Sequence, residues 1–423
     1  MTTQFRSLDD RLDYLYGLQR LGIKKGLGHT RALLRHCNNP QNHFPAIHIA
    51  GTNGKGSTSA LLASILSKAG YRTGLYTSPH LVRFNERVRV NGVPITDDAI
   101  IQFVDNYRPA IEEIQSTFFE TTTALAFSWF AEQNVDVAVI ETGLGGRLDS
   151  TNVVQPELSV ITPVAMDHQH ILGLTLRQIA REKAGIIKRK TPVITVRQNK
   201  DVAMVIRETA HRKEASVIRV PVPEEIEVVE TATRFFLAGE RYSVALPGYH
   251  QAENASIALT VARTYQPQIT QPVIQKGLDT IRWPGRMQCL SRKPLLYYDV
   301  AHNAHGIHSM LQTLASIRPS KPVGLLALKG DKDIVDIAGV VRGRFSRLIV
   351  SSLPDADLIP AETLARELTQ QKVDVDGVLP FSAAITALAT AAGRDRPGVI
   401  FGSHYIGKAV FSAFEFPFDT GRI

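Results

Sequence analysis

Residues 46–58, Ala-Ile-His-Ile-Ala-Gly-Thr-Asn-Gly-Lys-Gly-Ser-Thr, lead from an apolar run through a glycine-rich turn into a segment with helical character. Glycines in such a turn let the backbone bend so that several N–H groups face one anion, and the N-terminus of the next helix adds positive charge. Lys55 supplies a mobile cation, and the Ser57 hydroxyl is placed to bind magnesium. We therefore predict a phosphate-binding loop here.

This stretch departs from the standard GxxxxGK[ST] loop. Ile49 stands where the first glycine is expected, and Gly56 separates Lys55 from Ser57. The departure narrows the interpretation to fewer classes of nucleotide-binding protein. The alternative is a glycine-rich turn that only connects a strand to a helix.

Length and composition limit the class of protein. A chain of 423 residues is long enough for two domains, and 44% hydrophobic with 21% charged residues is typical of an ordinary soluble protein. The first thirty residues lack the apolar core of a signal peptide and no apolar run has membrane length, so we expect a cytoplasmic protein without a membrane partner. Cys37 and Cys289 are too few for a disulfide framework and we expect both to be structural.

A formal net charge of +8 is compatible with a protein that binds nucleic acid. The densest basic cluster, residues 188–190, is short and has no interleaved aromatic residues, so we expect no nucleic-acid partner. A polyanionic small substrate accounts for the excess equally well.

Apolar patterning predicts an α/β fold. Segments with helical spacing alternate with strand-like apolar runs. The helical segments are 8–36, the stretch from the loop through Lys68, 97–133 and 202–213, and the strand-like runs are 73–76, 135–140, 158–163 and 192–196. This alternation indicates a mainly parallel sheet up to about residue 220, and runs at 233–238 and 241–246 indicate a small antiparallel addition. Breakers at 283–286 and near 291–294 suggest a linker, followed by a second α/β pattern with strands at 295–300, 323–328, 347–352 and 399–402. We predict domains at 1–290 and 291–423.

Three polar side chains follow predicted strands of the first sheet. Ser78 follows the strand at 73–76, Glu141 follows the run at 135–140, and His168 comes after the run at 158–163. Ligands of open α/β sheets bind at the carboxyl ends of the strands, and a carboxylate followed by glycines can hold Mg²⁺ beside phosphates. The alternatives are a simple Ser-Pro turn, an N-capped loop with an Arg147–Asp149 pair, and a packed histidine.

These features together resemble the Mur-ligase-like ATP-dependent amide ligases, and within them the folylpolyglutamate/dihydrofolate synthases. The matching stretches occur in the family's order along nearly the whole chain. They are 51–57, 77–81, 84–87, 141–149 with Asn152, 167–168, 182–186, 250–254, 284–286, 299–303 and 331–333.

The resemblance implies a role for each matching position. The ATP phosphates would lie on Gly51, Thr52, Asn53, Gly54, Lys55, Gly56 and Ser57, with Asn254, Arg286 and Asp299 as contacts to base, phosphate and ribose, so that ATP lies between the two domains. Two magnesium ions would lie among Ser57, Ser78, Glu141, His168 and Lys183, the last as a carbamate formed with CO₂. Lys55, His168 and Lys183 would be the catalytic residues. An ordinary cation at a helix C-terminus is the alternative for Lys183.

The reaction that the resemblance implies is the addition of L-glutamate to a carboxylate of folate or dihydropteroate through an acyl phosphate. It needs ATP and Mg²⁺ but no redox cofactor, and the C-terminal domain would be a Rossmann-like glutamate ligase domain that closes to exclude water. Substrate contacts would come from Lys24, Thr117, Phe119, Asp149 and His302. Residues 23–27 depart from the family, because Lys24 and Lys25 stand where the bifunctional enzymes usually carry an acidic residue; solvated surface charges are the alternative there.

Other classes remain as alternatives. A Mur-type amino-acid ligase acting on a non-folate carboxylate is the nearest, although only fifty residues precede Gly51, fewer than a typical domain of about 100. A P-loop kinase is a second alternative, but its reaction does not require the second α/β domain. A non-enzymatic nucleotide-binding module is a third, but nucleotide binding alone does not require Lys55, Ser57, Glu141 and His168 together. We expect a monomer.

Overall fold

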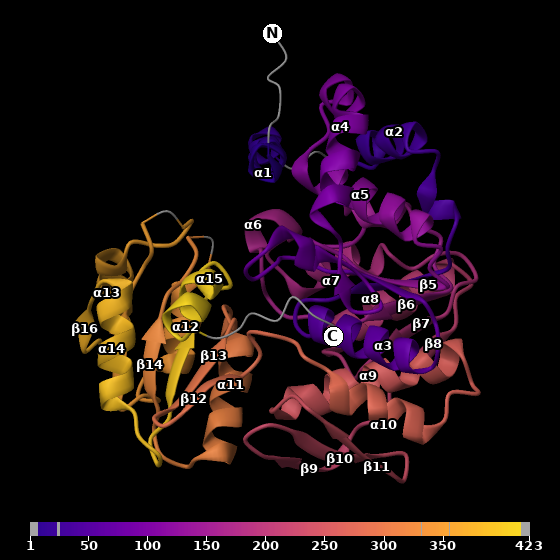
Figure 1. Ribbon diagram of the computed structural model, residues 1–423. Helices are drawn as coiled ribbons and strands as arrows, with labels where there is room; N and C mark the ends of the chain where they lie inside the picture. Colours follow the sequence, from indigo (N-terminus) through magenta and orange to yellow (C-terminus); the bar gives the residue numbers. More distant parts are fainter. Residues whose placement is uncertain (1–6, 23–25, 331, 355, 416–423) are drawn as a thin grey trace. The chain divides into compact units, whose positions relative to one another are not determined.

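The computed structural model describes residues 7–22, 26–330, 332–354 and 356–415 (Figure 1). The described chain forms two compact units. The first contains the residues up to Val222 together with Asn254–Thr280, and the second contains Pro223–Glu253 and the residues from Ile281 onward. Within these ranges, no helix combines the length and the apolar character that crossing a bilayer requires.

The first unit is built on an eight-stranded sheet with the order β4-β3-β2-β5-β1-β6-β7-β8. Six neighbouring strands, from β2 to β8 in this order, are parallel, and β3 and β4 continue the β2 edge antiparallel. The strands are β1 Ala46–Ala50, β2 Thr73–Tyr76, β3 Val88–Val90, β4 Val93–Pro94, β5 Val137–Glu141, β6 Leu158–Ile161, β7 Val193–Thr195 and β8 Val217–Arg219.

Helices connect these strands, as parallel neighbours require. They are α1 Leu8–Gly17, α2 Gly28–His36, α3 Lys55–Lys68, α4 Asp97–Ile114, α5 Phe118–Glu132, α6 Gln169–Leu172, α7 Leu176–Ala184, α8 Lys200–Arg212 and α10 Gln271–Thr280, with short 3₁₀ turns at Leu18–Leu21, Pro40–Asn42, Phe84–Arg87 and Ser150–Val153. Helix α9, Tyr249–Tyr265, begins in the second unit and ends in the first.

Local sequence explains where the longer helices begin. The Thr96 hydroxyl accepts the Ala99 N–H at the start of α4, and the Thr117 hydroxyl accepts the Glu120 N–H at the start of α5. Each such cap stabilises a helix by about 1 kcal/mol. Helix α4 ends at Ile114, and Gln115 after it adopts a left-handed conformation.

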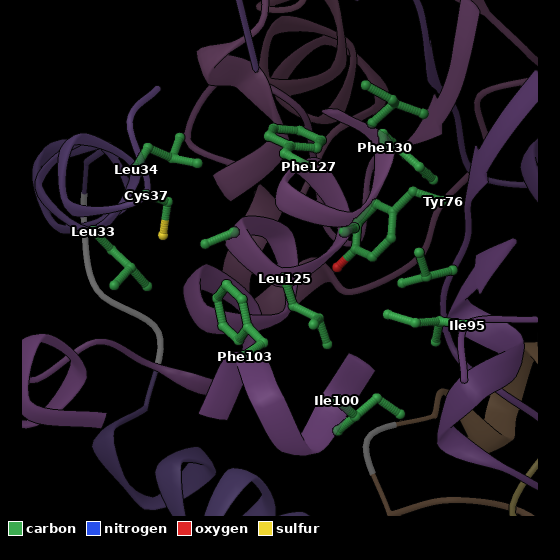
Figure 2. Packing of buried hydrophobic residues seen from close by; sticks show 14 of the residues in the cluster. Leu33, Leu34, Cys37, Tyr76, Ile95, Ile100, Phe103, Leu125, Phe127 and Phe130 are labelled. Carbon is green, nitrogen blue, oxygen red and sulfur yellow. The ribbon is translucent and has the colours of Figure 1, made fainter. Parts of the chain in front are cut away.

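The central strands are buried on both faces. Every residue of β1 and β5 is buried, and Ala46 of β1 with Ala138 and Ile140 of β5 join the core formed with α1, α2, α4 and α5. Figure 2 shows part of this core, including Phe127 and Phe130 of α5 and Tyr76 of β2. Helix α3 contacts β1, β2 and β5 and also packs on α10, so it is covered on both sides.

The second unit contains two sheets. One has three antiparallel strands in the order β11-β10-β9, namely β9 Glu224–Val228, β10 Thr233–Leu237 and β11 Glu240–Val244. The other has the order β12-β13-β17-β14-β15-β16 and is parallel except for β12. Its strands are β12 Gln288–Arg292, β13 Leu295–Asp299, β14 Val323–Leu326, β15 Arg347–Val350, β16 Gly377–Val378 and β17 Gly398–Phe401, and its helices are α11 Ala304–Ile317, α12 Ile334–Val341, α13 Ala361–Gln370, α14 Phe381–Ala391 and α15 Gly407–Ala413.

The predicted α/β class is confirmed, with a mainly parallel sheet in the first unit and a second mixed sheet in the other. The predicted linker was wrong in part, because Gln288–Arg292 is strand β12, paired antiparallel with β13. The three-stranded sheet, which falls within the predicted range 1–290, places Val228 in the core of the second unit. The limits 1–290 and 291–423 stay a prediction about folding domains.

Candidate active site

The loop after β1 approaches its surroundings so closely that two of its positions have room only for glycine. A Cβ atom on Gly51 would lie 1.8 Å from the Thr162 hydroxyl oxygen, and one on Gly54 would lie 2.2 Å from the amide oxygen of Asn254. Gly54 also has φ 82°, a left-handed conformation that disfavours residues with a side chain. These constraints fix the turn that delivers the chain into α3.

The segment after β6 holds this loop in place. The backbone oxygen of Pro163 accepts the N–H groups of Thr52 and Asn53, at 2.9 and 3.3 Å. The Thr162 hydroxyl donates to the backbone oxygen of Asn53 at 2.8 Å, and the Thr52 hydroxyl pairs with the backbone of Ala165. The N–H groups in the first turn of α3 have no acceptor within the helix by its geometry, which makes them available to an anion.

Lys55 and Glu141 come together beside this loop. Ile49 of β1 and Glu141 of β5 are paired in register, so the carboxylate stands next to the start of the loop. The Lys55 ammonium lies 3.8 Å from one carboxylate oxygen of Glu141, and the backbone N–H of Ser78 donates to the other at 3.3 Å. The Glu141 side chain is buried, and so is that of Ser57 in the first turn of α3.

Asp149 organises the glycine-rich loop after β5. One of its carboxylate oxygens accepts the Leu144 N–H at 2.8 Å, and the other accepts the N–H and hydroxyl of Thr151. A Cβ atom on Gly143 would be 3.4 Å from Asp149 and 3.6 Å from the Ser78 hydroxyl, so this loop runs beside Ser78. Burial raises the pKa of Asp149, and these hydrogen bonds oppose the rise.

The same loop docks on the end of α7 and brings Lys183 into the site. The backbone N–H of Arg147 donates to the backbone oxygen of Glu182 at 2.7 Å, and a Cβ atom on Gly146 would be 3.0 Å from the backbone oxygen of Lys183. The Lys183 ammonium is buried and donates to the backbone oxygen of Gly51 at 2.6 Å. Burial and the charge of Lys55 lower its pKa to about 7, against the opposing effect of Asp167 and Asp149.

His168 follows β6 and the segment at 162–165 that holds the loop. It has φ 48° and precedes the short helix α6, and its side chain is about one-third exposed. Its Nε2 atom lies 3.9 Å from a carboxylate oxygen of Asp167, the residue whose charge acts on Lys183.

Asn254, Arg286 and Asp299 divide between the two units. Asn254 belongs to the first unit and lies next to Gly54. In the second unit, the buried Asp299 accepts the backbone N–H groups of Met287 and Ala301, each at 2.8 Å, and so holds the turn that carries Arg286. Burial raises the pKa of Asp299, and the Arg286 charge opposes this.

The predicted substrate contacts differ in accessibility. Phe119 is 44% exposed and packs edge-on against Phe118, whereas the buried Thr117 uses its hydroxyl as the cap of α5. The ring of His302 pairs through Nδ1 with the backbone oxygen of Val300, at 2.9 Å. Lys24 lies outside the described residues.

A model of the Mur ligase middle domain matches residues 49–262, about half of the chain. The chain belongs to the Mur ligase family. A second model, of the Mur ligase glutamate ligase domain, matches residues 285–404. As a member of this family the chain is an ATP-dependent ligase, and this excludes the kinase and the non-enzymatic module as alternatives.

Individual Mur ligases with known names are similar over most of the chain. A folylpolyglutamate synthase from Lacticaseibacillus casei is 34% identical over 94% of this chain and 96% of its own length. A dihydrofolate synthase/folylpolyglutamate synthase from Bacillus subtilis is 38% identical over 73% of this chain and 76% of its own. The crystal structure of Mycobacterium tuberculosis folylpolyglutamate synthase complexed with ADP and AMPPCP matches with a TM-score of 0.89, at 30% identity over 96% of this chain and 99% of that one.

The structure of this Mur ligase also contains a supporting network that the sequence did not reveal. The buried carboxylate of Glu86 accepts the backbone N–H groups of Leu81, Val82 and Arg83, and so fixes the loop that follows Ser78. The Arg87 guanidinium donates to Nδ1 of His80 at 2.8 Å. The motif at 84–87 marked this region, but nothing in the sequence identified the atoms that Glu86 binds.

Proposed function

We propose that the chain joins L-glutamate to a folate carboxylate, using ATP and forming an acyl phosphate. The observation that carries this proposal is the meeting of Lys55, Glu141 and Ser78 beside a loop built to receive an anion. The similar proteins named folylpolyglutamate synthase supply the substrate class.

A carboxylate must be activated before an amine can attack it, because the oxide that would otherwise have to leave is a poor leaving group. An oxygen of the folate carboxylate attacks the γ-phosphorus of ATP, ADP leaves, and the product is a mixed anhydride. The glutamate amine, in its neutral form, then attacks the acyl carbon and expels phosphate, while its extra proton passes to solvent. Lys55 and the N–H groups of the loop neutralise charge as the phosphoryl group is transferred. No protein nucleophile is required.

The nucleotide would be held by the loop from Gly51 to Ser57 and by Asn254. Asn254 supports this assignment because its amide oxygen approaches Gly54, the residue that directly precedes α3. We assign Arg286 and Asp299 to phosphate and ribose in the same proposal. Each oxygen of Asp299 accepts one backbone N–H group and keeps a second lone pair, which can accept a ribose hydroxyl.

Mg²⁺ fits the donors near the loop. The part of the chain that the structure describes has no cluster of three or more His, Cys, Asp or Glu side chains suited to a metal ion. Mg²⁺ takes few protein ligands and completes its coordination shell with water and phosphate oxygens. The carboxylate of Glu141 and the hydroxyls of Ser57 and Ser78 suit such an ion. We propose these residues, with His168, as the ligands of two ions that would neutralise the transferred phosphate.

Lys183 has the properties needed to form a carbamate. With its pKa lowered to about 7, a large fraction of its amine is neutral near neutral pH, and only the neutral amine has the lone pair that attacks CO₂. The new N–C bond forms as one proton leaves to solvent, and the carbamate nitrogen keeps one hydrogen for the Gly51 oxygen. Incubation with ¹³CO₂ followed by ¹³C NMR should show a carbamate signal that Lys183→Met removes; an unchanged spectrum would refute this assignment.

For the folate itself, the exposed ring of Phe119 near the Asp149 loop offers an aromatic contact, since Ser150 donates to the backbone oxygen of Phe119 at 3.2 Å. We propose Phe119 and Asp149 as substrate contacts, with Thr117 shaping the turn, and His302 as a contact to glutamate. Dihydropteroate is the second candidate acceptor, because similar proteins such as the one from Bacillus subtilis are named both dihydrofolate synthase and folylpolyglutamate synthase. A similar Escherichia coli structure is described as a complex with DHPP and ADP.

The deciding experiment measures ADP release with each acceptor. Release should require L-glutamate together with tetrahydrofolate or dihydropteroate, and mass spectrometry should find the acceptor enlarged by a glutamyl residue. Release that depends instead on a UDP-muramyl peptide would overturn the proposal in favour of a cell-wall amino-acid ligase. A monomeric state and a cytoplasmic location stay predictions, the first open to light scattering.

A further inference from the structure

A cavity of about 370 Å³ opens beside the last strands of the first unit, away from the residues assigned above. Its lining comes from the carboxyl ends of β7 and β8, from the chain that follows each strand, and from the first turns of α8. Thr195 and Arg219, the last residues of the two strands, are paired in register. The cavity therefore lies on the same edge of the parallel sheet as the phosphate loop, which is the edge where such folds bind ligands.

The cavity has an apolar floor and a cationic rim. Ala203 and Ile206 of α8 line it together with Val217 and Val220, whereas the charged lining residues are Arg197, Arg207 and Arg219. No carboxylate is among the lining residues. Within the ranges that the structure describes, these three exposed guanidinium groups form no ion pair, although Arg177 and Glu208 pair nearby at 3.7 Å.

Gln198, another lining residue, is held in place by hydrogen bonds within the protein. The Gln198 side chain donates to the backbone oxygen of Thr162 at 2.9 Å and to the Thr195 hydroxyl at 3.2 Å, and it accepts the Val164 N–H at 3.1 Å. Its polar groups are thus engaged within the protein. The arginines remain as the charged contacts for an occupant.

We propose that this cavity is a second binding site, which takes a small organic dianion with an apolar body. Three guanidinium groups match paired oxygens of phosphate or carboxylate groups, because each offers a planar set of N–H donors. The floor of Ala203, Ile206, Val217 and Val220 provides the surface against which an aryl or alkyl group loses contact with water. A phosphate monoester and a dicarboxylate share this chemistry.

The test is calorimetric titration of the full chain with phenyl phosphate and with phthalate, which separate the two sources of the dianion. At least one should bind, more tightly than inorganic phosphate does, and its affinity should fall at least tenfold in the Arg207→Gln/Arg219→Gln variant. Arg212→Gln is the matched control, because Arg212 is an exposed residue of α8 outside the cavity. Binding should persist in Lys55→Ala, which separates this cavity from the phosphate loop.

Several outcomes would overturn the proposal. They are binding of neither probe, equal affinity for inorganic phosphate, or an affinity unchanged by the double arginine substitution. Loss of binding in Lys55→Ala would assign the probe to the phosphate loop and would also count against a second site. None of these readouts needs turnover, so failure of the ligase proposal would leave them interpretable.

Discussion

The ammonium of Lys183, near the end of α7, donates a 2.6 Å hydrogen bond to the backbone oxygen of Gly51, at the start of the phosphate loop. This contact ties the loop after β1 to a helix more than a hundred residues later in the chain. The Lys183 side chain is buried, and this bond joins it to a segment outside its own helix.

The lowered pKa of Lys183 predicts a pH dependence of stability. Below about pH 7 the lysine is protonated in both states, so the folded state carries the cost of a buried charge. Between about 7 and the ordinary value of 10.5, the unfolded chain binds more protons, so the free energy of unfolding rises with pH. In CO₂-free buffer, the difference between the native chain and Lys183→Met should change by about 2 kcal/mol from pH 7 to pH 9, in favour of the native chain.

Urea unfolding followed by Trp129 fluorescence, in a Trp283→Phe background, reports this change for the first unit alone. The chain has two tryptophans, and only Trp129 lies in that unit. Lys68→Met, at an exposed position of α3 in the same unit, should show no such difference. A difference between the native chain and Lys183→Met that stays constant with pH would contradict the lowered pKa.

Removal of the Lys55 ammonium should abolish ligase turnover. If this cation neutralises the transferred phosphate, Lys55→Ala should lower the rate of ADP release by about 10²-fold or more. Circular dichroism should be unchanged, because Lys55 is not among the buried residues of the core. Lys68→Ala, at the other end of α3, is the control, and turnover near the native rate in Lys55→Ala would refute the phosphate role.

Gly54→Ala tests the close approach that shapes the loop. The new methyl group would collide with Asn254 and require a left-handed conformation, so we expect nucleotide affinity to fall at least tenfold. The measurement is fluorescence titration with a labelled ADP. Gly28→Ala, where the added methyl group meets open space, should bind normally; equal affinities in the two variants would mean that the loop tolerates the change.

Glu86→Gln tests the carboxylate under the loop that follows Ser78. One amide oxygen cannot replace two charged oxygens that accept three N–H groups, so the variant should lose about 1–3 kcal/mol of stability. We also expect a lower kcat, because Ser78 donates to Glu141 from the start of this loop. Glu112→Gln, on the exposed surface of α4, should leave both quantities near the native values. An unaltered kcat in a destabilised Glu86→Gln variant would limit Glu86 to a structural role.

Sequence patterning located the central strands because their burial leaves a continuous apolar signal. The run at 135–140 became β5, Val137–Glu141, and the run at 73–76 became β2 without change. The resulting strand order places Ser78 and Glu141 together, which the pattern alone anticipated through the shared edge of a parallel sheet.

Other features depend on partners distant in sequence and left no local signal. Strand β12 was missed because proline and glycine precede it and its pairing with β13 is irregular between Cys289 and Ser291. Thr162 donates to the phosphate loop and Gln198 donates to the backbone oxygen of Thr162, and neither residue type indicates that role by itself. Glu86 was visible as part of a motif, but its function appears only when the three N–H groups are seen around it.

The packing of α10 on α3 has a consequence for synthesis of the chain on the ribosome. Gly277 lies against Ile65, and its backbone oxygen accepts the Ser64 hydroxyl at 2.8 Å, so the outer side of α3 receives its cover from residues beyond 270. A nascent chain that has emerged only to Val222 holds the phosphate loop and all eight strands of its sheet, yet its α3 still lacks that cover. Chaperone binding to stalled nascent chains should therefore drop once α10 has left the exit tunnel.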